Sequence, residues 1–473
     1  MKGGKNFNDI EISKKMRNIK PKLKIIFKPL LYSEMFFIFT VFLYLTGPVE
    51  YNKVNLPFLL FLLFIYQLMF ILGYIFFVKR HAITVINDNP LSSSLNKTKH
   101  KERKVFHLLK FLIVTTLIFQ MIIFYIYTQI APIDFNEIIS SVLFSINDPI
   151  SSYTQSFSNS SYSGILILFL VLYSPFLYFT FALGIYYLGK LSLFYKLTLL
   201  MAIVYEVMRW VVLGRNKGVF DMLIIVFSVI IIKILQNRFI NPREKRRKEF
   251  IKQSLNIVLV IILSVLVLSY FTNTIGSRTQ HYSYSPEYYN SLLLKITPNF
   301  LHSFLIYLTN YLTQGYRALS HIADVTWTPM FGIGNSTFLI ANFGSVFKTD
   351  LFQYTYQFKL TEYGIDSTAS WHTFYTWVAN DVHWLGVTIV MFFIGYFFAF
   401  VSVRAIVYRD TIAYPLFALL FMIIFYMSGN NQVFSYPYSF MAFWLLIIYW
   451  LLIKLKVIKY SSLVNKEPTL INN

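Results

Sequence analysis

The 473-residue chain has no cysteine and few charged residues, which make up 13 % of it. The lack of cysteine excludes disulfide bonds, thiolate catalysis and zinc or iron–sulfur sites built on cysteine. A soluble domain of this size would need far more charge to cover its surface. No acidic pair has the spacing of a divalent-cation site, and no glycine-rich nucleotide motif is present. We therefore expect no metal, no cofactor and no ATP-driven pump.

Long apolar runs are what the chain has instead. Hydrophobic residues make up 56 % of the sequence and aromatic residues 19 %, and the mean hydropathy is +0.56. Runs of about 20 apolar residues are long enough to cross a bilayer as a helix, so we predict an all-α polytopic membrane protein with about ten transmembrane helices. The predicted spans are 29–47, 57–78, 105–130, 164–187, 194–213, 219–236, 253–271, 382–403, 412–428 and 437–453.

The net charge of +21 is distributed as short basic blocks beside the apolar runs. This pattern orients helices in a membrane, and nucleic acid is excluded as a partner because no basic domain with interleaved aromatic residues exists. With both termini in the cytoplasm, about 32 of the 42 Lys and Arg residues lie inside and about nine outside. Residues 1–28 and 454–473 are then basic cytoplasmic tails, and no cleavable signal peptide is expected.

One loop between the seventh and eighth spans is unusually long. Residues 272–381 separate the spans of 29–271 from those of 382–453, whereas most connections are shorter than about 15 residues. Within this loop, residues 298–319 place apolar side chains at helical spacing, opposite a polar face. We expect an extracytoplasmic cap that contains an amphipathic helix lying over the bundle.

Cations are concentrated in one predicted outer turn, RWVVLGRNKGVFD at 209–221, against the usual bias of membrane proteins. Glu206 lies three residues before Arg209, and Asp221 lies four residues after Lys217, so each acid shares a helix face with a cation. Two interpretations are open. Either the charges only lock the helices and reach lipid headgroups, or they form an anion site.

A lipid-linked phosphate or pyrophosphate is the ligand that best explains cations on this side. An Arg guanidinium matches two phosphate oxygens at once, and a Lys ammonium adds a point charge. Gly214 and Gly218 bracket the turn and permit close approach of a ligand to the backbone. The predicted binding residues are Arg209, Arg215, Lys217, Arg278 and Arg317.

The end of the long loop, STASWHTFYTWVANDVHWLG at 367–386, is rich in aromatic and polar residues. Its aromatic residues fit either a membrane-interface belt or a surface that stacks on sugar rings. They are Trp371, Tyr375, Trp377 and Trp384. Asp381 either caps the eighth helix or reads sugar hydroxyls. The last outer turn adds amides that suit hydroxyl recognition, Asn430, Asn431 and Gln432.

Several short motifs resemble those of the bacterial repeat-unit polymerases of O-antigen and capsule synthesis (Wzy type). They are GRNKGVFD, YLTQGYRALSHIADVTWTPMFGIGNST, and GNNQ followed by YPYSF, and they fall mainly within residues 209–221, 310–337 and 371–432. The layout of many spans with one large outer loop is similar too. Lys217 and Asp221 match the family's Asn–Lys–Gly turn, in which a small residue often stands at the position of Arg215. The residues that match its cap motif are Gly315, Gly332, Gly334 and Asn335.

The resemblance implies glycosyl transfer at the outer leaflet of the bacterial cytoplasmic membrane. The expected partners are membrane lipid and an undecaprenyl-pyrophosphate-linked oligosaccharide, and a chain-length regulator is a further one. Such chemistry needs cations at the departing oxygen and a base for the acceptor hydroxyl. The residues expected to hold the pyrophosphate are Arg209, Arg215, Lys217 and Arg278. The candidate bases are Asp381, His372 and His321, in that order.

Three other functions are open at this point. An O-antigen ligase has a similar outer loop and cationic site but attaches finished glycan to a different acceptor. A lipid-linked oligosaccharide flippase requires polar residues through many helices and two similar halves, whereas this chain concentrates its polar residues in one outer region. A structural scaffold for glycan assembly explains the paired membrane charges less well.

Overall fold

The computed structural model describes residues 21–49, 51, 53–87, 95–158, 164–240, 268–276, 291–367 and 370–454, and over these residues it is helical without strands. The long helices of the bundle are α2 (Lys28–Thr46), α3 (Leu56–Asn87), α4 (Leu95–Thr128), α7 (Gly164–Tyr186), α8 (Leu193–Val212), α9 (Lys217–Ile240), α15 (Phe374–Ile406), α16 (Ala413–Tyr426) and α18 (Pro437–Lys454). The other helical segments are α5 (Phe135–Asn147), α6 (Pro149–Ser158), η1 (Leu188–Lys190), α11 (Leu292–Ile296), η3 (Asn299–Leu301), α12 (His302–Ser320), α13 (Thr337–Phe347), η4 (Leu351–Tyr354), α14 (Tyr356–Lys359), η5 (Leu360–Tyr363) and α17 (Gln432–Ser435).

Five helical stretches in the described residues are long and apolar enough to cross a membrane. They are Lys28–Thr46, Leu56–His81, Arg103–Thr128, Lys217–Ile240 and Phe374–Ile406. Helices α7, α8, α16 and α18 match four further predicted spans, while most of the span 253–271 lies outside the described residues. The chain is therefore an all-α membrane protein, and the count of about ten spans stays a prediction.

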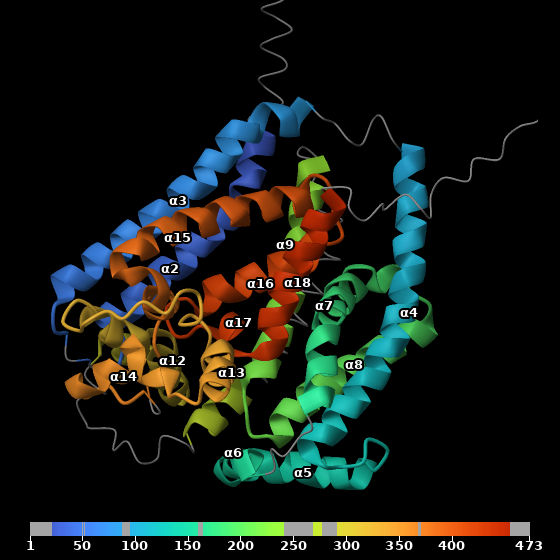
Figure 1. Cartoon of the computed structure of the whole chain (residues 1–473). Coiled ribbons are helices and arrows are strands. Elements are labelled where there is room, and N and C mark those ends of the chain that lie inside the picture. Colours follow the sequence, from blue (N-terminus) through green and yellow to red (C-terminus); the bar gives the residue numbers. More distant parts are fainter. Residues whose placement is uncertain are drawn as a thin grey trace, which may run out of the picture.

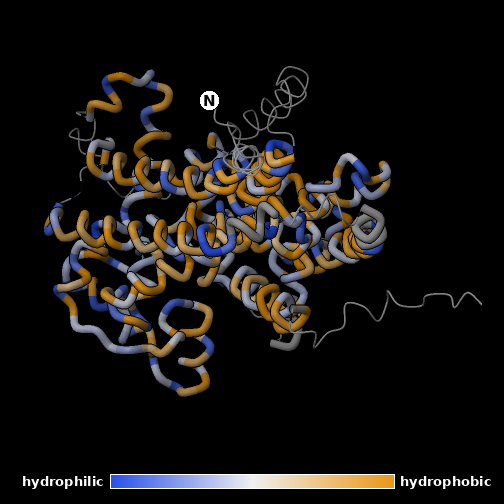
Figure 2. Tube along the Cα trace, turned by 90° about the horizontal axis from the view of Figure 1, so that it is seen from above, coloured by the Kyte–Doolittle hydropathy of each residue, from blue (hydrophilic) through white to orange (hydrophobic). Residues whose placement is uncertain are grey.

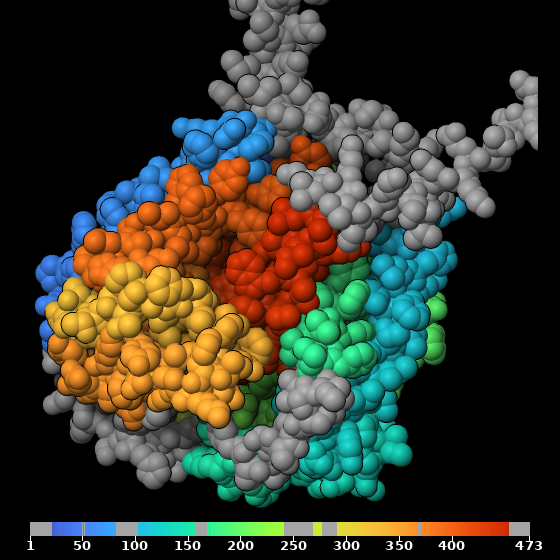
Figure 3. Space-filling model, viewed as in Figure 1, coloured from blue at the N-terminus to red at the C-terminus, as the bar shows by residue number. Residues whose placement is uncertain are grey.

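The segments predicted to lie outside the membrane gather at one end of the bundle. Figure 1 shows α5, α6, α12, α13 and α14 together at the bottom of the view, whereas the last turns of α3 and α9 and the first turn of α4 lie at the top. Figure 3 shows the cap residues (yellow to orange) covering part of this end, with α16–α18 (red) visible beside them. The sorting of loops to the same side agrees with the predicted threading; which compartment each end faces stays a prediction.

Apolar residues cover the outer sides of the long helices as well as their packed sides. Figure 2, seen from above, shows apolar positions over most turns of these helices. Large apolar side chains such as Ile38, Phe61 and Phe64 are more than half exposed. A helix that is apolar on all sides is expected where lipid replaces water around the protein.

Glycines allow α3 and α15 to pack with their backbones in contact. A Cβ atom on Gly73 would lie 2.0 Å from the carbonyl oxygen of Phe392, and a Cβ atom on Gly395 would lie 2.0 Å from that of Phe70. Close approach through small residues is a common way for helices to pack in membranes. These two glycines thus fix the contact between α3 and the helix that carries the last cap residues into the bundle.

Replacing Gly395 with alanine is expected to destabilise the protein, because the new methyl group meets the backbone of α3 and not a movable side chain. Overpacking of this kind typically costs about 1–3 kcal/mol. Gly189→Ala is the matched control, since no atom lies within 4 Å of its Cβ position. Thermal unfolding of the purified variants measures the difference, and equal melting temperatures would show that this contact does not limit stability.

The predicted amphipathic helix is present as α12, and it is inserted against the bundle more deeply than expected. The hydroxyl of Tyr316 lies 2.8 Å from the hydroxyl of Thr40 in α2. A Cβ atom on Gly315 would lie 2.7 Å from the carbonyl oxygen of Ser428, in the turn after α16. The cap helix is therefore wedged between α2 and that turn.

Helix α15 consists of two helical segments that meet at His383, whose φ of 63° and ψ of 156° interrupt the helix. The first segment begins at Phe374, where the preceding Thr373 accepts a hydrogen bond from the backbone N–H of Thr376 at 3.1 Å. The second segment corresponds to the predicted span 382–403. The predicted end of the cap loop thus coincides with the bend, while the helix itself begins earlier.

Candidate functional site

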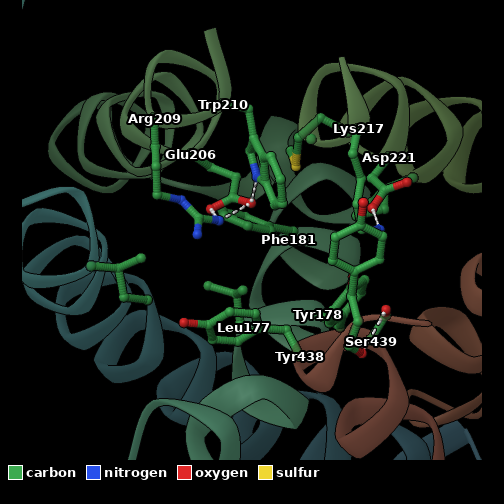
Figure 4. A pocket seen from close by; sticks show the side chains of 15 residues that line it. Leu177, Tyr178, Phe181, Glu206, Arg209, Trp210, Lys217, Asp221, Tyr438 and Ser439 are labelled. Atoms are coloured by element: carbon green, nitrogen blue, oxygen red, sulfur yellow. Dashed lines mark hydrogen bonds and ion pairs between the residues drawn. The ribbon is translucent and has the colours of Figure 1, made fainter. Parts of the chain in front are cut away.

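A small cavity lies where α8, α9 and the start of α18 meet, beside α4 and α7 (Figure 4). Its volume is about 30 Å³. Charged side chains and tyrosine rings dominate its polar lining, and we call it the ion-pair cavity. These residues are Glu206, Arg209, Lys217, Asp221, Tyr178, Tyr436 and Tyr438.

Helix α8 places Glu206 and Arg209 one turn apart on one face. Nη2 of Arg209 donates to both carboxylate oxygens of Glu206, at 2.7 Å each, and the indole Nε1 of Trp210 donates to Oε1 of Glu206 at 2.8 Å. Glu206 is 9 % exposed and Arg209 is 3 % exposed. A charge at this depth is costly unless it is paired, so the acid neutralises its neighbour. The expected pairing of the two residues is confirmed.

Glu206 does not use all the donors of the Arg209 guanidinium. The ion pair is made by Nη2, and the buried Nε has no hydrogen-bond partner among the described residues. The ring centres of Tyr127, Trp210 and Tyr438 lie 5.2, 4.8 and 5.8 Å from the guanidinium carbon. Figure 4 shows the guanidinium and Tyr438 on opposite sides of the cavity. Arg209 therefore keeps a donor for a further polar group inside an aromatic wall.

Lys217 begins α9 and forms an ion pair with Asp221, one turn further along the helix. Both side chains are buried. The hydroxyl of Tyr426 donates to Oδ1 of Asp221 at 3.4 Å, and the Lys217 ammonium lies 4.5 Å from the ring centre of Tyr436. The expected pairing of Lys217 with Asp221 is also confirmed.

Two glycines shape the turn between α8 and α9. Gly214 has a φ of 62°, which favours glycine, and a Cβ atom there would lie 2.7 Å from the carbonyl oxygen of Pro149. A Cβ atom on Gly218 would lie 1.8 Å from the indole of Trp210. The indole thus packs on the bare backbone of α9 while its N–H holds Glu206. Through Trp210, the helix end that carries the Glu206–Arg209 pair therefore packs directly on the helix start that carries the Lys217–Asp221 pair.

Arg215 lies against α6 and not in the ion-pair cavity. Its Nη2 donates to the hydroxyl of Ser156 at 2.9 Å, and its guanidinium carbon lies 5.6 Å from the ring centre of Tyr153. Two more predicted cations are apart from the cavity or outside the described residues. Arg317 lies in the last turn of α12, with Nη2 3.9 Å from the Cβ position of Gly364, and Arg278 lies outside the described residues. The structure therefore brings Arg209 and Lys217 together.

Two cations and two carboxylates balance the charge of the ion-pair cavity. A volume of about 30 Å³ accommodates roughly two water molecules, so a larger anion requires the wall to open. Tyr436 lies in the wall beside Lys217 and Tyr438 lies in the wall beside Arg209, and neither was among the residues predicted for the site. The YPYSF segment beside the amide turn was the available signal. Among the described residues, no cluster of three or more His, Asp or Glu is arranged to hold a metal ion.

No family model, curated protein or solved structure matches the chain.

Asp381 binds one loop of the cap with both of its carboxylate oxygens. Oδ1 accepts the backbone N–H groups of Gly332 and Gly334 at 2.8 Å each. Oδ2 accepts the backbone N–H of Asn335 at 2.9 Å and its side-chain amide at 2.8 Å. These hydrogen bonds fill the acceptor positions of the carboxylate, so Asp381 holds the loop 332–335 in place and does not cap α15. The geometry gives no support to Asp381 as a base.

The loop 332–335 also contacts the turn that precedes α18. The amide nitrogen of Asn431 donates to the carbonyl oxygen of Asn335 at 2.6 Å, and Oδ1 of Asn430 accepts the backbone N–H of Asn431 at 2.7 Å. Asn431 and Gln432 each keep a buried amide oxygen without a hydrogen-bond partner in the described part of the chain. The predicted amides thus lie at the junction between the cap and the bundle, next to the chain segment that lines the ion-pair cavity.

His372 lies in the segment that leads into α15 and is 2 % exposed. Burial lowers its pKa to about 4, against the opposing effect of a hydrogen bond with the backbone of Ser370. Its Nε2 has no hydrogen-bond partner among the residues described. The ring is therefore neutral at physiological pH, and it does not line the ion-pair cavity.

Acid is expected to destabilise the protein through His372. Because its folded-state pKa lies below the ordinary value of 6.5, the folded state disfavours the protonated ring. The stability of the neutral form is complete above pH 6.5 and is lost as the pH falls towards 4, by up to about 3 kcal/mol. Thermal unfolding across this window should therefore depend less on pH in His372→Gln than in the unchanged protein. Parallel pH profiles would assign the acid sensitivity to another group.

His321 has the orientation of a general base more clearly than the other two candidates. It follows the last turn of α12, and its Nδ1 lies 3.0 Å from Oδ2 of Asp324. A carboxylate that orients an imidazole is the usual arrangement around such a base. Its ring centre lies 5.0 Å from that of Tyr363, and the side-chain amide of Asn55 donates to the same Asp324 oxygen at 3.3 Å.

Of the four aromatic residues predicted to stack on sugars, two are buried and two are half-buried. Tyr375 is 1 % exposed and Trp377 is 7 % exposed, while Trp371 and Trp384 are half-buried. The indole of Trp327, in the cap, is 38 % exposed and was not part of the predicted set. Trp327 is therefore more accessible for stacking on a sugar ring than Tyr375 or Trp377.

Proposed function

We propose that the chain is a glycosyltransferase that polymerises undecaprenyl-pyrophosphate-linked oligosaccharide repeat units into surface polysaccharide, either O-antigen or capsule. The observation that carries the proposal is the buried Arg209 guanidinium, whose Nε has no hydrogen-bond partner among the described residues and which lines the same cavity as Lys217. The motifs at 209–221 and 310–337 support the same assignment by resemblance.

Both cations occupy helix ends that face the cap end of the bundle. Arg209 lies in the last turn of α8, and Lys217 lies in the first turn of α9. At the start of α9, backbone N–H groups add partial positive charge beside Lys217. The guanidinium and the ammonium then contact the pyrophosphate after Tyr436 and Tyr438 move aside. The end that carries the cap is assigned to the outer side of the bacterial cytoplasmic membrane, and both termini to the cytoplasm.

The reaction forms one bond and breaks one bond at the anomeric carbon of the growing glycan. A hydroxyl oxygen of the new repeat unit attacks this carbon, and the bond from the carbon to the pyrophosphate oxygen breaks. The hydroxyl proton passes to a base. His321 is the candidate whose imidazole a carboxylate orients, but like His372 it does not line the ion-pair cavity, so its assignment depends on its contact with Asp324 alone. Undecaprenyl pyrophosphate leaves with the bonding electrons, and Arg209 and Lys217 stabilise the charge on the departing oxygen.

The test is transfer in vitro by the purified full-length protein in lipid vesicles. With lipid-linked repeat units as the sole substrate, a ladder of products spaced by one repeat is expected. Transfer of finished glycan to a different acceptor, without a ladder, would identify a ligase. Movement of the substrate across the bilayer without a new glycosidic bond would identify a flippase. In the producing cell, deletion of the gene should leave single repeat units at the surface, and unchanged chain length would contradict the proposal.

A further inference from the structure

Helix α5 lies across the cap end of the bundle in Figure 1, whereas the long helices run from end to end. One side of α5 packs on the bundle. Ile138 belongs to an apolar cluster with Phe124 of α4, and the hydroxyl of Ser145 donates to the carbonyl oxygen of Val212 in α8 at 2.9 Å. This side attaches α5 to the rest of the protein.

A second side of α5 is apolar and exposed. Its members recur every three or four residues, which places them on one face of the helix. They are Phe135, Ile139, Leu143 and Ile146, with exposed fractions of 61, 54, 55 and 37 %. Apolar surface left in water costs about 25 cal/mol per Å², so a face with this composition favours an apolar environment.

A third side of α5 is mainly polar and also exposed, with Glu137 and Ser140 three residues apart. The exposed Phe144 lies beside them, and Asn136, seven residues before Leu143, lies at the border with the apolar side. The helix surface is therefore divided into a protein-facing side, an apolar side and a polar side. This division is typical of a helix that lies in the interface between lipid and water.

The neighbours of α5 indicate what covers the apolar side. Helices α4 and α8, on which α5 packs, expose apolar side chains that a bilayer has to cover. Examples are Ile118 and Ile122 in α4 and Leu197 and Leu200 in α8. Figure 3 shows the residues of α4 and α5 adjoining on one side of the molecule. The apolar side of α5 thus continues a surface that already faces lipid.

We propose that α5 is an interfacial helix whose apolar side lies among the outer acyl chains and headgroups of the bilayer. Segment 131–163 contains no Lys or Arg, so attraction to anionic headgroups does not hold it there. Burial of apolar surface does, and the attachment is therefore insensitive to salt. The inference is independent of the proposed function.

Helix α6 extends this membrane contact to the turn beside the ion-pair cavity. The hydroxyl of Ser152 donates to that of Ser145 in α5 at 2.9 Å, and the hydroxyl of Ser156 accepts a hydrogen bond from Arg215 at 2.9 Å. The backbone at Pro149 contacts Gly214 of the same turn. The depth of α5 in the interface therefore fixes the depth of the turn that follows α8.

The absence of cysteine allows a direct test with single labelling sites in the full-length protein. Ile139→Cys and Ile146→Cys carry an environment-sensitive fluorophore on the apolar side, and Glu137→Cys and Ser140→Cys carry it on the polar side as matched controls. In vesicles of phosphatidylcholine and phosphatidylglycerol, doxyl-labelled lipid should quench the first pair severalfold more than the second. Aqueous iodide should show the reverse order.

Two pairs of positions keep the test valid if one variant folds poorly. Equal iodide quenching at all four positions would overturn the proposal, because the apolar side would then face water. Energy transfer between labels on two protein copies at Ile139→Cys, without quenching by lipid, would assign the face to a second copy of the chain and overturn it too. A severalfold loss of lipid quenching at high salt would contradict attachment by apolar burial.

Discussion

Replacing Glu206 with glutamine is expected to destabilise the protein more than replacing both Glu206 and Arg209 with apolar residues. The single change leaves Arg209, which is 3 % exposed, without its counter-charge, and such a loss typically costs about 3–5 kcal/mol. Glutamine still offers an oxygen to the indole of Trp210, so the difference reports the charge. The double variant Glu206→Leu/Arg209→Met removes both charges and is expected to lose only about 1–3 kcal/mol, because the indole N–H of Trp210 loses its acceptor.

Thermal unfolding of the purified variants, followed by intrinsic fluorescence, measures these differences. Asp410→Asn is the matched control, because its ion pair with Arg404 at 2.8 Å involves a guanidinium side chain that is 37 % exposed. Loss of a partly exposed pair is expected to cost about 1 kcal/mol or less. Equal losses in Glu206→Gln and Asp410→Asn would show that burial of the Glu206–Arg209 pair is not what stabilises the protein.

The same double variant separates stability from function. It is expected to fold but to form no ladder of repeat units, because the guanidinium that would hold the pyrophosphate is gone. A ladder of normal length from folded Glu206→Leu/Arg209→Met would contradict the proposed role of Arg209 and leave the pair a purely structural one.

Lys217→Met is expected to lower the rate of polymerisation by about 10²- to 10³-fold, as loss of one group that stabilises developing charge typically does. The change also leaves the buried Asp221 carboxylate without its cation, which is expected to destabilise the protein. A second variant is needed to separate this loss of stability from the loss of activity. Lys217→Met/Asp221→Asn is the companion variant, which should regain stability without regaining activity. Rates are measured from the growth of the product ladder in vesicles.

A control on the same predicted side of the membrane completes this test. Lys295→Met removes an exposed cation from α11 and is expected to leave the rate unchanged. If the companion variant of Lys217 polymerises as fast as Lys295→Met, then Lys217 serves only to pair with Asp221.

The local part of the site was predictable from the sequence. Spacings of three and four residues placed Glu206 beside Arg209 and Lys217 beside Asp221, because such residues share a helix face. The same reasoning found α12 and the start of a span at residue 382, next to the bend at His383, from apolar periodicity. These features depend on neighbours within one or two helical turns, and a single sequence contains that information.

The long-range part was not predictable. Asp381 contacts Gly332, Gly334 and Asn335, and nothing in its own surroundings distinguished this role from a helix cap or a base. Arg215 carries the same charge as Arg209 but lies against α6, because the turn geometry directs the two side chains apart. Such assignments depend on which helices meet in space, and this is set by contacts such as the one between Gly395 and the backbone of α3.

The hydrogen bonds of the loop 332–335 also determine how late this loop can fold while the protein is being synthesised. The loop leaves the ribosome before Asp381, which binds its backbone, and well before Asn431, which binds the carbonyl oxygen of Asn335. It therefore reaches its final conformation only after the segment that leads into α18 has been made. Since chains are synthesised from the N-terminus, the first helices are already made before the cap can complete its folding. The junction between cap and ion-pair cavity is thus among the last parts of the protein to mature.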